Sequence, residues 1–198
     1  MPKASPAANP LSRRAVHITA EPMHALIKSC ALAIALCLLP GVAPAKAPDG
    51  WPFVDFNEAV RVAKRENKPM FVYFGFANCR YCEYANKRTF ASDALRKRYV
   101  DHYVLAYFDI RGNPDDVIAL PGGEKLTRTD AIKRLRSSPV PAWMFMSPDG
   151  QEILMRRGSR TPVEAFMQFD LYVAGGAYKR SSFGDFLAQR GLREAKAE

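Results

Sequence analysis

Cysteine and histidine are scarce in this chain of 198 residues, and their placement narrows the chemistry that it can support. The sequence holds four cysteines and three histidines. Two of the cysteines, Cys30 and Cys37, lie in an N-terminal segment, which leaves Cys79 and Cys82 in the body of the chain, together with His102 as its one histidine. A tetrahedral zinc site needs four ligands, and a second cysteine pair is absent, so we expect no metal site.

Two other common uses of a CxxC motif fit Cys79-Arg80-Tyr81-Cys82 poorly. Covalent haem attachment needs a histidine directly after the second cysteine, and Glu83 stands there. A disulfide between residues so close in sequence closes too small a loop to stabilise a fold much through chain entropy. The pair therefore favours dithiol/disulfide chemistry.

The chain also lacks an apolar run long enough to span a bilayer, which takes about 20 residues. The apolar run 31–39 follows a short, weakly basic lead that begins at Met23, and Pro40-Gly41 and three small alanines come after it. This order is typical of a secretory signal peptide. An uncleaved membrane anchor is the alternative interpretation.

We therefore expect residues 1–47 to be a targeting segment, with the signal peptide at 23–45 or 23–47 and with Met1 or Met23 as the start. Export places the protein in an oxidising compartment, where disulfides persist. The expected location is the periplasm.

The basic excess of the chain is modest once the targeting segment is set aside. The net charge of the whole chain is +9, and removal of residues 1–47 takes away five basic residues and one acid, which leaves 24 − 19 = +5. These charges are spread along the predicted helices, whereas a nucleic-acid site would cluster them. We expect no nucleic-acid partner, and the absence of an evident dimerisation segment suggests a monomer.

Residues 48–190 are predicted to form one domain, followed by a flexible tail over 191–198. Helices are predicted over about 55–66, 79–88, 92–99, 129–136, 161–173 and 182–189. Strands are predicted over 70–76, 103–110, 142–146 and 151–157, with a long loop over 111–126. A strand, a crossover helix and a second strand imply a parallel pair, and the Asp149-Gly150 turn adds an antiparallel hairpin, so the fold class is α/β with a mixed sheet.

Local signals place the helix starts. Asp55 and Thr161 each stand three residues before a glutamate, the capping-box pattern, with Pro162 predicted at the first helical position of the later helix. Thr129 is predicted to cap the helix that follows the long loop. Cys79 falls at a strand-to-helix junction, where unpaired backbone N–H groups and the positive end of the helix dipole favour the reactive thiolate.

Several of these features together resemble the thioredoxin superfamily. The matching residues are the aromatic strand that leads into Cys79 and Cys82, the stretch Ser138–Phe145 some 60 residues on, the turn 148–150 and Gly158. The resemblance implies a thioredoxin fold: a mixed four- to five-stranded sheet flanked by helices, here with an insert around 111–126 and a helical C-terminal tail.

The resemblance also implies roles for individual residues. Cys79 would be an exposed nucleophile that forms a mixed disulfide with a partner, and Cys82 would be the shielded, resolving cysteine. Arg80 would lower the pKa of Cys79, and Tyr81 would belong to the dipeptide that tunes the redox potential. Pro141 would be the cis-proline beside the CxxC motif. Its cis bond would turn the backbone of Val140 outward to pair with a client chain.

Within the superfamily the chain is similar to exported thioredoxins of the SoxW type. The stretches that carry this likeness are Trp51–Lys68, the insert from Asp109 to Leu126, and the tail residues 166–178 and 183–187. Two positions depart from the usual thioredoxin pattern. Tyr73 stands where a buried acid helps to move a proton at the second cysteine, and Asn78 replaces the tryptophan before the first cysteine.

We therefore predict a periplasmic thiol–disulfide oxidoreductase that reduces exported client proteins through Cys79, needs no metal or organic cofactor, and receives electrons from a membrane partner. An alternative is a thiol oxidant or disulfide isomerase, which Tyr81 and the missing acid favour. A third hypothesis is a non-catalytic interaction module that holds a client at the Pro141 groove. The sequence leaves open the client and the direction of electron flow.

Overall fold

The computed structural model describes residues 47–195. The predicted targeting segment lies outside this range except for Ala47, so the signal peptide and its cleavage site stay predictions. Residues 193–195 of the predicted flexible tail lie against α6 (Val163–Val173), because Gln168 donates to the carbonyl of Arg193 and accepts from the backbone N–H of Ala195. Within 47–195 no helix has the length and apolar character needed to cross a membrane.

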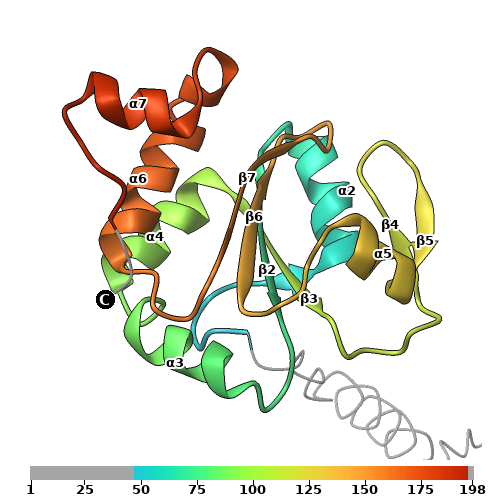
Figure 1. Ribbon diagram of the computed structural model, residues 1–198. Helices are drawn as coiled ribbons and strands as arrows, with labels where there is room; N and C mark the ends of the chain where they lie inside the picture. The colour runs from blue at the N-terminus through green and yellow to red at the C-terminus, as the bar shows by residue number, and fades with distance from the viewer. Residues whose placement is uncertain (1–46, 196–198) are drawn as a thin grey trace, which may run out of the picture. The chain divides into compact units, whose positions relative to one another are not determined.

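A five-stranded mixed sheet forms the centre of the described domain (Figure 1). Its strands, in spatial order, are β1 (Val54–Asp55), β3 (Val104–Asp109), β2 (Met70–Gly75), β6 (Ala142–Met146) and β7 (Glu152–Arg157). β3 runs parallel to β1 and β2, whereas β6 runs antiparallel to both β2 and β7. The predicted α/β fold with a mixed sheet is confirmed, and the two-residue β1 is an edge strand that the sequence did not predict.

Helices cover both faces of this sheet (Figure 1). They are α2 (Phe56–Glu66), α3 (Arg80–Arg88), α4 (Asp93–His102), α5 (Arg128–Arg134), α6 (Val163–Val173) and α7 (Phe183–Gln189), with a 3₁₀ turn at Ala177–Lys179. α2 and α5 lie on one side of the sheet, and α3, α4 and α6 lie on the other. Each of the predicted helices is present, including the helix of the C-terminal tail.

Two of the predicted helix caps are wrong. α5 begins two residues earlier than predicted, because the Thr127 side chain accepts a hydrogen bond from the Asp130 backbone N–H at 3.2 Å, which makes Thr127 the cap in place of Thr129. α6 begins after Pro162 with no side-chain cap, so the predicted Thr161 capping box does not form. Thr161 instead donates its hydroxyl to the carbonyl of Gly158.

The insert over 111–126, predicted to be a long loop, contains a small hairpin of its own. β4 (Val117–Ala119) and β5 (Lys125–Thr127) pair antiparallel as a separate two-stranded sheet. Asn57 of α2 fixes this hairpin to the domain, because its amide donates to the Val117 carbonyl at 2.9 Å and accepts from the Ala119 N–H at 2.8 Å. The insert is therefore tied to α2 on the side of the sheet away from α3.

The central strands are buried on both faces, and the two faces differ in composition. All six residues of β2 are buried, with Phe71 and Tyr73 on one face and Met70, Val72 and Phe74 on the other. The first face continues into a large aromatic cluster that also contains both cysteines of the CxxC motif. Its aromatic members include Trp51, Phe90, Tyr99, Tyr103, Tyr107, Trp143, Phe145, Phe166 and Phe169. The CxxC motif thus rests on the aromatic face of the sheet.

A fully buried carboxylate joins α4 to α6. Asp170 is 0% exposed and pairs with Arg98, accepts a hydrogen bond from the Tyr103 hydroxyl at 3.0 Å, and lies 2.7 Å from Nδ1 of His102. A buried charge is tolerated when it is paired and hydrogen-bonded in this way. His102, the one histidine of the domain, therefore has a structural role.

Removal of the Asp170 charge should weaken the whole domain. Asp170→Asn leaves Arg98 without its partner, and because the Arg98 side chain is partly solvated we expect the free energy of unfolding to fall by about 1–2 kcal/mol. Urea denaturation measures this fall, with Asp101→Asn on the exposed surface of α4 as the matched control. Equal stability of the Asp170→Asn and Asp101→Asn proteins would contradict the structural role of Asp170.

Buried tyrosines should make the domain sensitive to alkali. Burial is the largest cause that raises the pKa of Tyr73, Tyr99, Tyr103 and Tyr107 above the ordinary value. In the unfolded chain these phenols ionise near pH 10, whereas in the folded protein they stay protonated to higher pH. Their contribution to stability is complete below about pH 10 and is lost as the pH rises above it.

Urea titrations between about pH 8 and pH 11 should therefore show a steep loss of stability above pH 10, together with additional tyrosinate absorbance from the buried tyrosines when the protein unfolds. Tyr73→Phe should make the loss less steep, because one raised pKa is removed. A free energy of unfolding that stayed constant up to pH 11 would contradict the role of the buried tyrosines in the alkaline loss of stability.

Candidate functional site: the Cys79–Cys82 pair

Cys79 and Cys82 form a disulfide at the start of α3, with their Cα atoms 5.2 Å apart. Cys79 is the N-cap residue of α3, with an extended backbone, and its sulfur accepts a hydrogen bond from the Cys82 N–H at 3.2 Å. Cys79 is 4% exposed and Cys82 is 3% exposed. The sequence predicted an exposed Cys79, so this expectation is wrong for the disulfide form, in which both residues are covered.

A tight turn after β2 delivers Cys79 to the helix start. The Cys79 N–H donates to the Phe76 carbonyl at 3.3 Å, and Asn78 lies in the left-handed region with φ of 62°. Asparagine adopts this conformation more readily than most residues, and a tryptophan would be strained there. The presence of asparagine in place of tryptophan before Cys79 therefore suits the local backbone.

Pro141 reaches the same edge of the sheet from a distant part of the sequence. β2 pairs antiparallel with β6, with Phe74 opposite Ala142, so the residue before Ala142 lies beside the end of β2 that leads to Cys79. The Val140–Pro141 peptide bond is cis, and so is the Ser138–Pro139 bond, which the sequence did not predict. The Pro141 carbonyl accepts from the Gly158 N–H at 3.1 Å, which joins the loop to the end of β7.

Three of the predicted site residues line one shallow pocket of about 240 Å³. Its lining is Tyr81, Pro139, Val140, Pro141, Arg157, Gly158 and Ser159. Tyr81 is 65% exposed, whereas Arg80, on the same turn of α3, is exposed but is not part of this lining.

Arg157 and Ser159 are functional candidates that the sequence analysis missed. They reach the pocket only because the β6–β7 hairpin places Arg157 opposite Ala142. Gly158, one of the residues that carry the family resemblance, lies between Arg157 and Ser159 and was the signal in the sequence that pointed to this part of the site.

Among residues 47–195 no cluster of three or more histidine, cysteine or acidic side chains is arranged to hold a metal ion. The chemical groups at this edge of the sheet are the two sulfurs, the backbone of α3 and the proline loop.

The profile of the thioredoxin-like domain matches residues 56–173 of the chain, which is more than half of it and includes the CxxC motif and Pro141. The chain belongs to the thioredoxin-like family.

Solved structures agree with this membership at the level of the fold. A thioredoxin from Thermus thermophilus superposes with a TM-score of 0.53 at 20% identity, covering 66% of this chain and 93% of that one. A thioredoxin-fold protein from Helicobacter pylori gives a TM-score of 0.51 at 19% identity, covering 63% of this chain and 80% of the other.

An uncharacterised protein of Caenorhabditis elegans is 28% identical over 93 residues, which are 47% of this chain and 12% of that protein. The thioredoxin-like chain therefore spans only a small part of that relative.

In this thioredoxin-like protein a phenol lies behind the disulfide. Tyr73 is fully buried, and its hydroxyl donates to Oδ1 of Asn86 at 3.0 Å and lies 3.5 Å from the Cys82 carbonyl oxygen. Burial and, to a lesser extent, the neighbouring Tyr107 raise the pKa of Tyr73, so its hydroxyl stays neutral. Tyr73 thus links β2 to α3 without adding a charge beneath Cys82.

Gly75 makes room for these two phenols. A Cβ atom at Gly75 would lie 3.0 Å from the Tyr107 hydroxyl oxygen and 3.1 Å from Cε1 of Tyr73. Real side chains rarely pack so tightly, so glycine at this position lets both rings lie under the turn that carries the cysteines.

Tyr73→Phe should lower the free energy of unfolding by about 1 kcal/mol, because it removes the hydrogen bond to Asn86. We expect equal losses in the oxidised and reduced proteins, and therefore no change in the reduction potential. Urea titrations of both redox forms measure this, with the exposed Tyr81→Phe as the control for stability. A shift in potential on Tyr73→Phe would show that the phenol tunes the cysteine pair.

Proposed function

We propose that this protein is an exported thiol–disulfide oxidoreductase that exchanges disulfides with client proteins through Cys79 and Cys82. The observation that carries the proposal is the redox-capable disulfide at the N-terminus of α3, next to the pocket that Pro141 lines. The short separation of the two cysteines argues for chemistry, since such a small loop adds little stability.

In the leading version the protein is a reductase. The Cys79 thiolate attacks one sulfur of a client disulfide, so that a mixed disulfide forms and the other client sulfur leaves as a thiolate that takes up a proton. Cys82, deprotonated, then attacks the Cys79 sulfur and releases the second client sulfur. The client gains two electrons, and Cys79 and Cys82 end as the disulfide seen here.

The surroundings of Cys79 suit it to the first attack. Its sulfur already accepts the Cys82 N–H and lies at the positive end of the dipole of α3, and both interactions favour a thiolate. Cys82 lies one turn into the helix, where it can reach the Cys79 sulfur.

A client chain would pair with the backbone of Val140. The sheet hydrogen bonds of β6 begin at Ala142, so Val140 precedes the ladder at the rim of the pocket. An extended client segment would add to this edge in the manner of a further strand.

We further propose that the protein works in the periplasm, that a membrane protein with a dithiol returns two electrons to Cys79 and Cys82, and that the chain is a SoxW-type thioredoxin. The signal-like N-terminal sequence supports export. The structured insert, with β4 and β5, and the helix α7 supply the additional segments on which the SoxW likeness depends.

A thiol oxidant or isomerase is the second candidate, and Tyr73 favours it. A buried carboxylate could take a proton from Cys82, whereas the neutral Tyr73 phenol is a poor proton acceptor. An oxidant would use the same residues in the opposite direction: a client thiolate attacks the disulfide, and the client leaves oxidised.

Substitution of each cysteine distinguishes thiol–disulfide exchange, by a reductase or by an oxidant, from non-covalent binding of a client. Cys79→Ser should abolish reduction of a protein disulfide such as that of insulin, whereas Cys82→Ser should accumulate a covalent mixed disulfide with its client, visible on a non-reducing gel. If Cys79→Ser retained client binding and the wild-type protein showed no exchange, the protein would be an interaction module.

The reduction potential of the pair decides the direction. A value near about −270 mV, obtained by equilibration in thiol redox buffers, is expected for a reductase that needs a dedicated electron supply. A value near about −120 mV would make the protein an oxidant.

A further inference from the structure

A second surface hollow adjoins the pocket beside the disulfide. It has a volume of about 410 Å³ and lies between α3 and residues 159–164, and the two hollows share Ser159 in their linings. Together they form one groove, which we call the arginine groove, defined by the residues that line either hollow. The groove runs from Val140 and Pro141 along α3 to Arg88.

Exposed aromatic side chains form part of the wall of the arginine groove. Tyr81 is 65% exposed and Tyr84 is 43% exposed, and they stand three residues apart on one face of α3. Tyrosine and arginine, together with tryptophan, are the residue types that most often carry binding energy in protein interfaces. Exposed tyrosines in a hollow beside a reactive disulfide therefore favour a polypeptide ligand.

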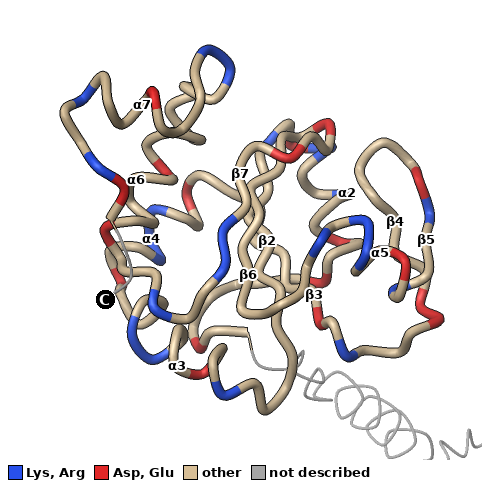
Figure 2. Tube along the Cα trace, in the orientation of Figure 1, with Lys and Arg blue, Asp and Glu red and all other residues tan. Residues whose placement is uncertain are grey.

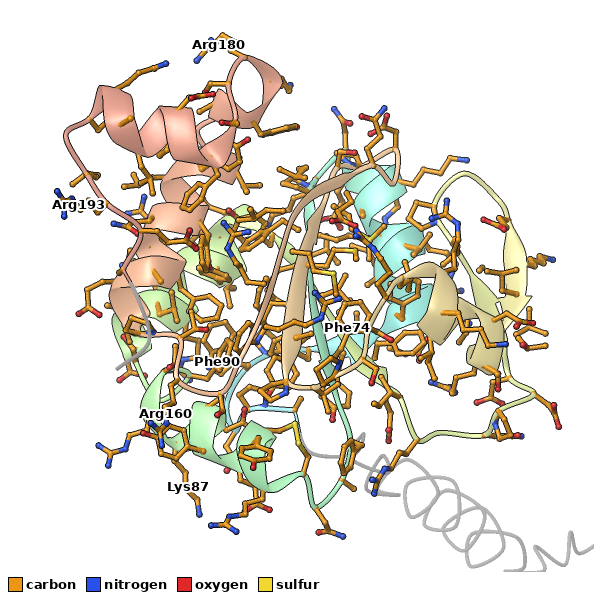
Figure 3. The ribbon with its side chains drawn as sticks, viewed as in Figure 1. Phe74, Lys87, Phe90, Arg160, Arg180 and Arg193 are labelled. Atoms are coloured by element: carbon orange, nitrogen blue, oxygen red, sulfur yellow. A yellow bond between two sulfur atoms is a disulfide. The ribbon has the colours of Figure 1, made fainter. Side chains whose placement is uncertain are left out.

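The charge of the arginine groove is predominantly positive. Arg88, Arg157 and Arg160 line it, and Glu164 is its one acidic lining residue. Figure 3 shows Arg160 beside α3, and Figure 2 shows further basic positions along α3 and the end of β7.

The side chains of Arg88 and Arg157 are available for a ligand carboxylate. Arg157 donates to the Arg136 carbonyl and to the sulfur of Met155, and Arg88 lies 5.9 Å from the centre of the Tyr84 ring. Within residues 47–195 neither pairs with a carboxylate, in contrast to Arg136, which pairs with Glu152.

We propose that the arginine groove selects client segments that carry acidic residues close to the reacting cysteine. This inference rests on the proposed function and adds the chemical class of its substrate. A client cysteine that reaches Cys79 past Val140 places its neighbouring residues beside Arg157 and along α3.

The geometry sets the spacing of the acidic residues. From Cys79 to Arg88 the helix rises about 13 Å at 1.5 Å per residue, and an extended chain covers about 3.3–3.6 Å per residue. An acidic residue about four positions from the client cysteine therefore meets Arg88, and a nearer one meets Arg157.

Disulfide-bonded peptides of one length test the proposal, with glutamate, glutamine or lysine at two positions, one next to the cysteine and one about four residues from it. For the wild-type protein we expect kcat/KM for the glutamate peptide to exceed that for the glutamine peptide by about three- to tenfold at low salt, because two exposed ion pairs contribute modestly. The ratio should fall towards one as the salt concentration rises.

Substitutions in the arginine groove test which residues cause the preference for the glutamate peptide. Arg157→Gln should lower the preference to about the square root of the wild-type ratio, because one of the two ion pairs remains. Arg88→Glu should lower it further and favour the lysine peptide, because it replaces an attraction for glutamate with a repulsion. Lys64→Glu, on the exposed surface of α2 across the sheet, changes the net charge as Arg88→Glu does and should leave the preference intact. Two variants are used because either arginine alone could also affect folding, which circular dichroism monitors.

Equal kcat/KM for the three peptides, or an equal loss of preference in Lys64→Glu and Arg88→Glu, would overturn the acidic specificity while leaving the oxidoreductase proposal in place. Absence of exchange with every peptide would overturn the proposed function itself, and the specificity with it.

Discussion

The antiparallel pairing of β2 with β6 is the constraint on which the candidate site depends. Because the two strands run in opposite directions, the end of β2 lies beside the start of β6, with Phe74 opposite Ala142. The CxxC turn and the Pro141 loop, separated by about 60 residues of sequence, therefore meet at one edge of the sheet. A shift of register by one residue would exchange the two faces and send Tyr73 to the face of Met70, Val72 and Phe74.

The same pairing gives the site a rigid support. The aromatic face under α3 contains Tyr73, Phe90 and Trp143 in mutual contact, so the helix that carries the cysteines rests on closely packed rings. The buried Asp170 joins α4 to α6 on this same side of the sheet. Aromatic packing and the buried ion pair stabilise the sheet and its helices, whereas the residues that would contact a client lie at the edge of the sheet.

The departures from the usual thioredoxin pattern have physical consequences in this chain. Tyr73 occupies the site beneath Cys82 with a neutral hydroxyl, so in the proposed exchange a proton at Cys82 would have to move through another group, such as solvent or the client. Asn78 matches the left-handed turn before Cys79. Around the pocket and the adjoining hollow the charged side chains are mainly arginines, so the surface beside the disulfide is positively charged, and the proposed clients would carry acidic residues that match it.

Local physical chemistry determined much of the fold, and the sequence therefore predicted it. The continuous apolar run of β2, the cap at Asp55 and the Asp149-Gly150 turn each act within a few residues, and these elements formed as expected. The position of Cys79 as the N-cap residue of α3 follows from the same local rules.

At α5 the cap expected from the sequence was wrong. Thr127 caps the helix in place of Thr129, because its hydroxyl accepts a hydrogen bond from the Asp130 backbone N–H and also donates one to the Asp130 carboxylate.

Tertiary structure decided the features that join distant segments. The hairpin within the insert depends on Asn57, which lies far from it in sequence, and Arg157 and Ser159 reach the pocket only through the pairing of β6 with β7. The burial of Cys79 likewise depends on packing against the aromatic face. The sequence by itself determined the cysteine pair and its helix, because capping and periodicity are local. Strand register decided the pocket, the place of Arg157 in its lining and the burial of the sulfurs, because it brings together residues that no local pattern connects.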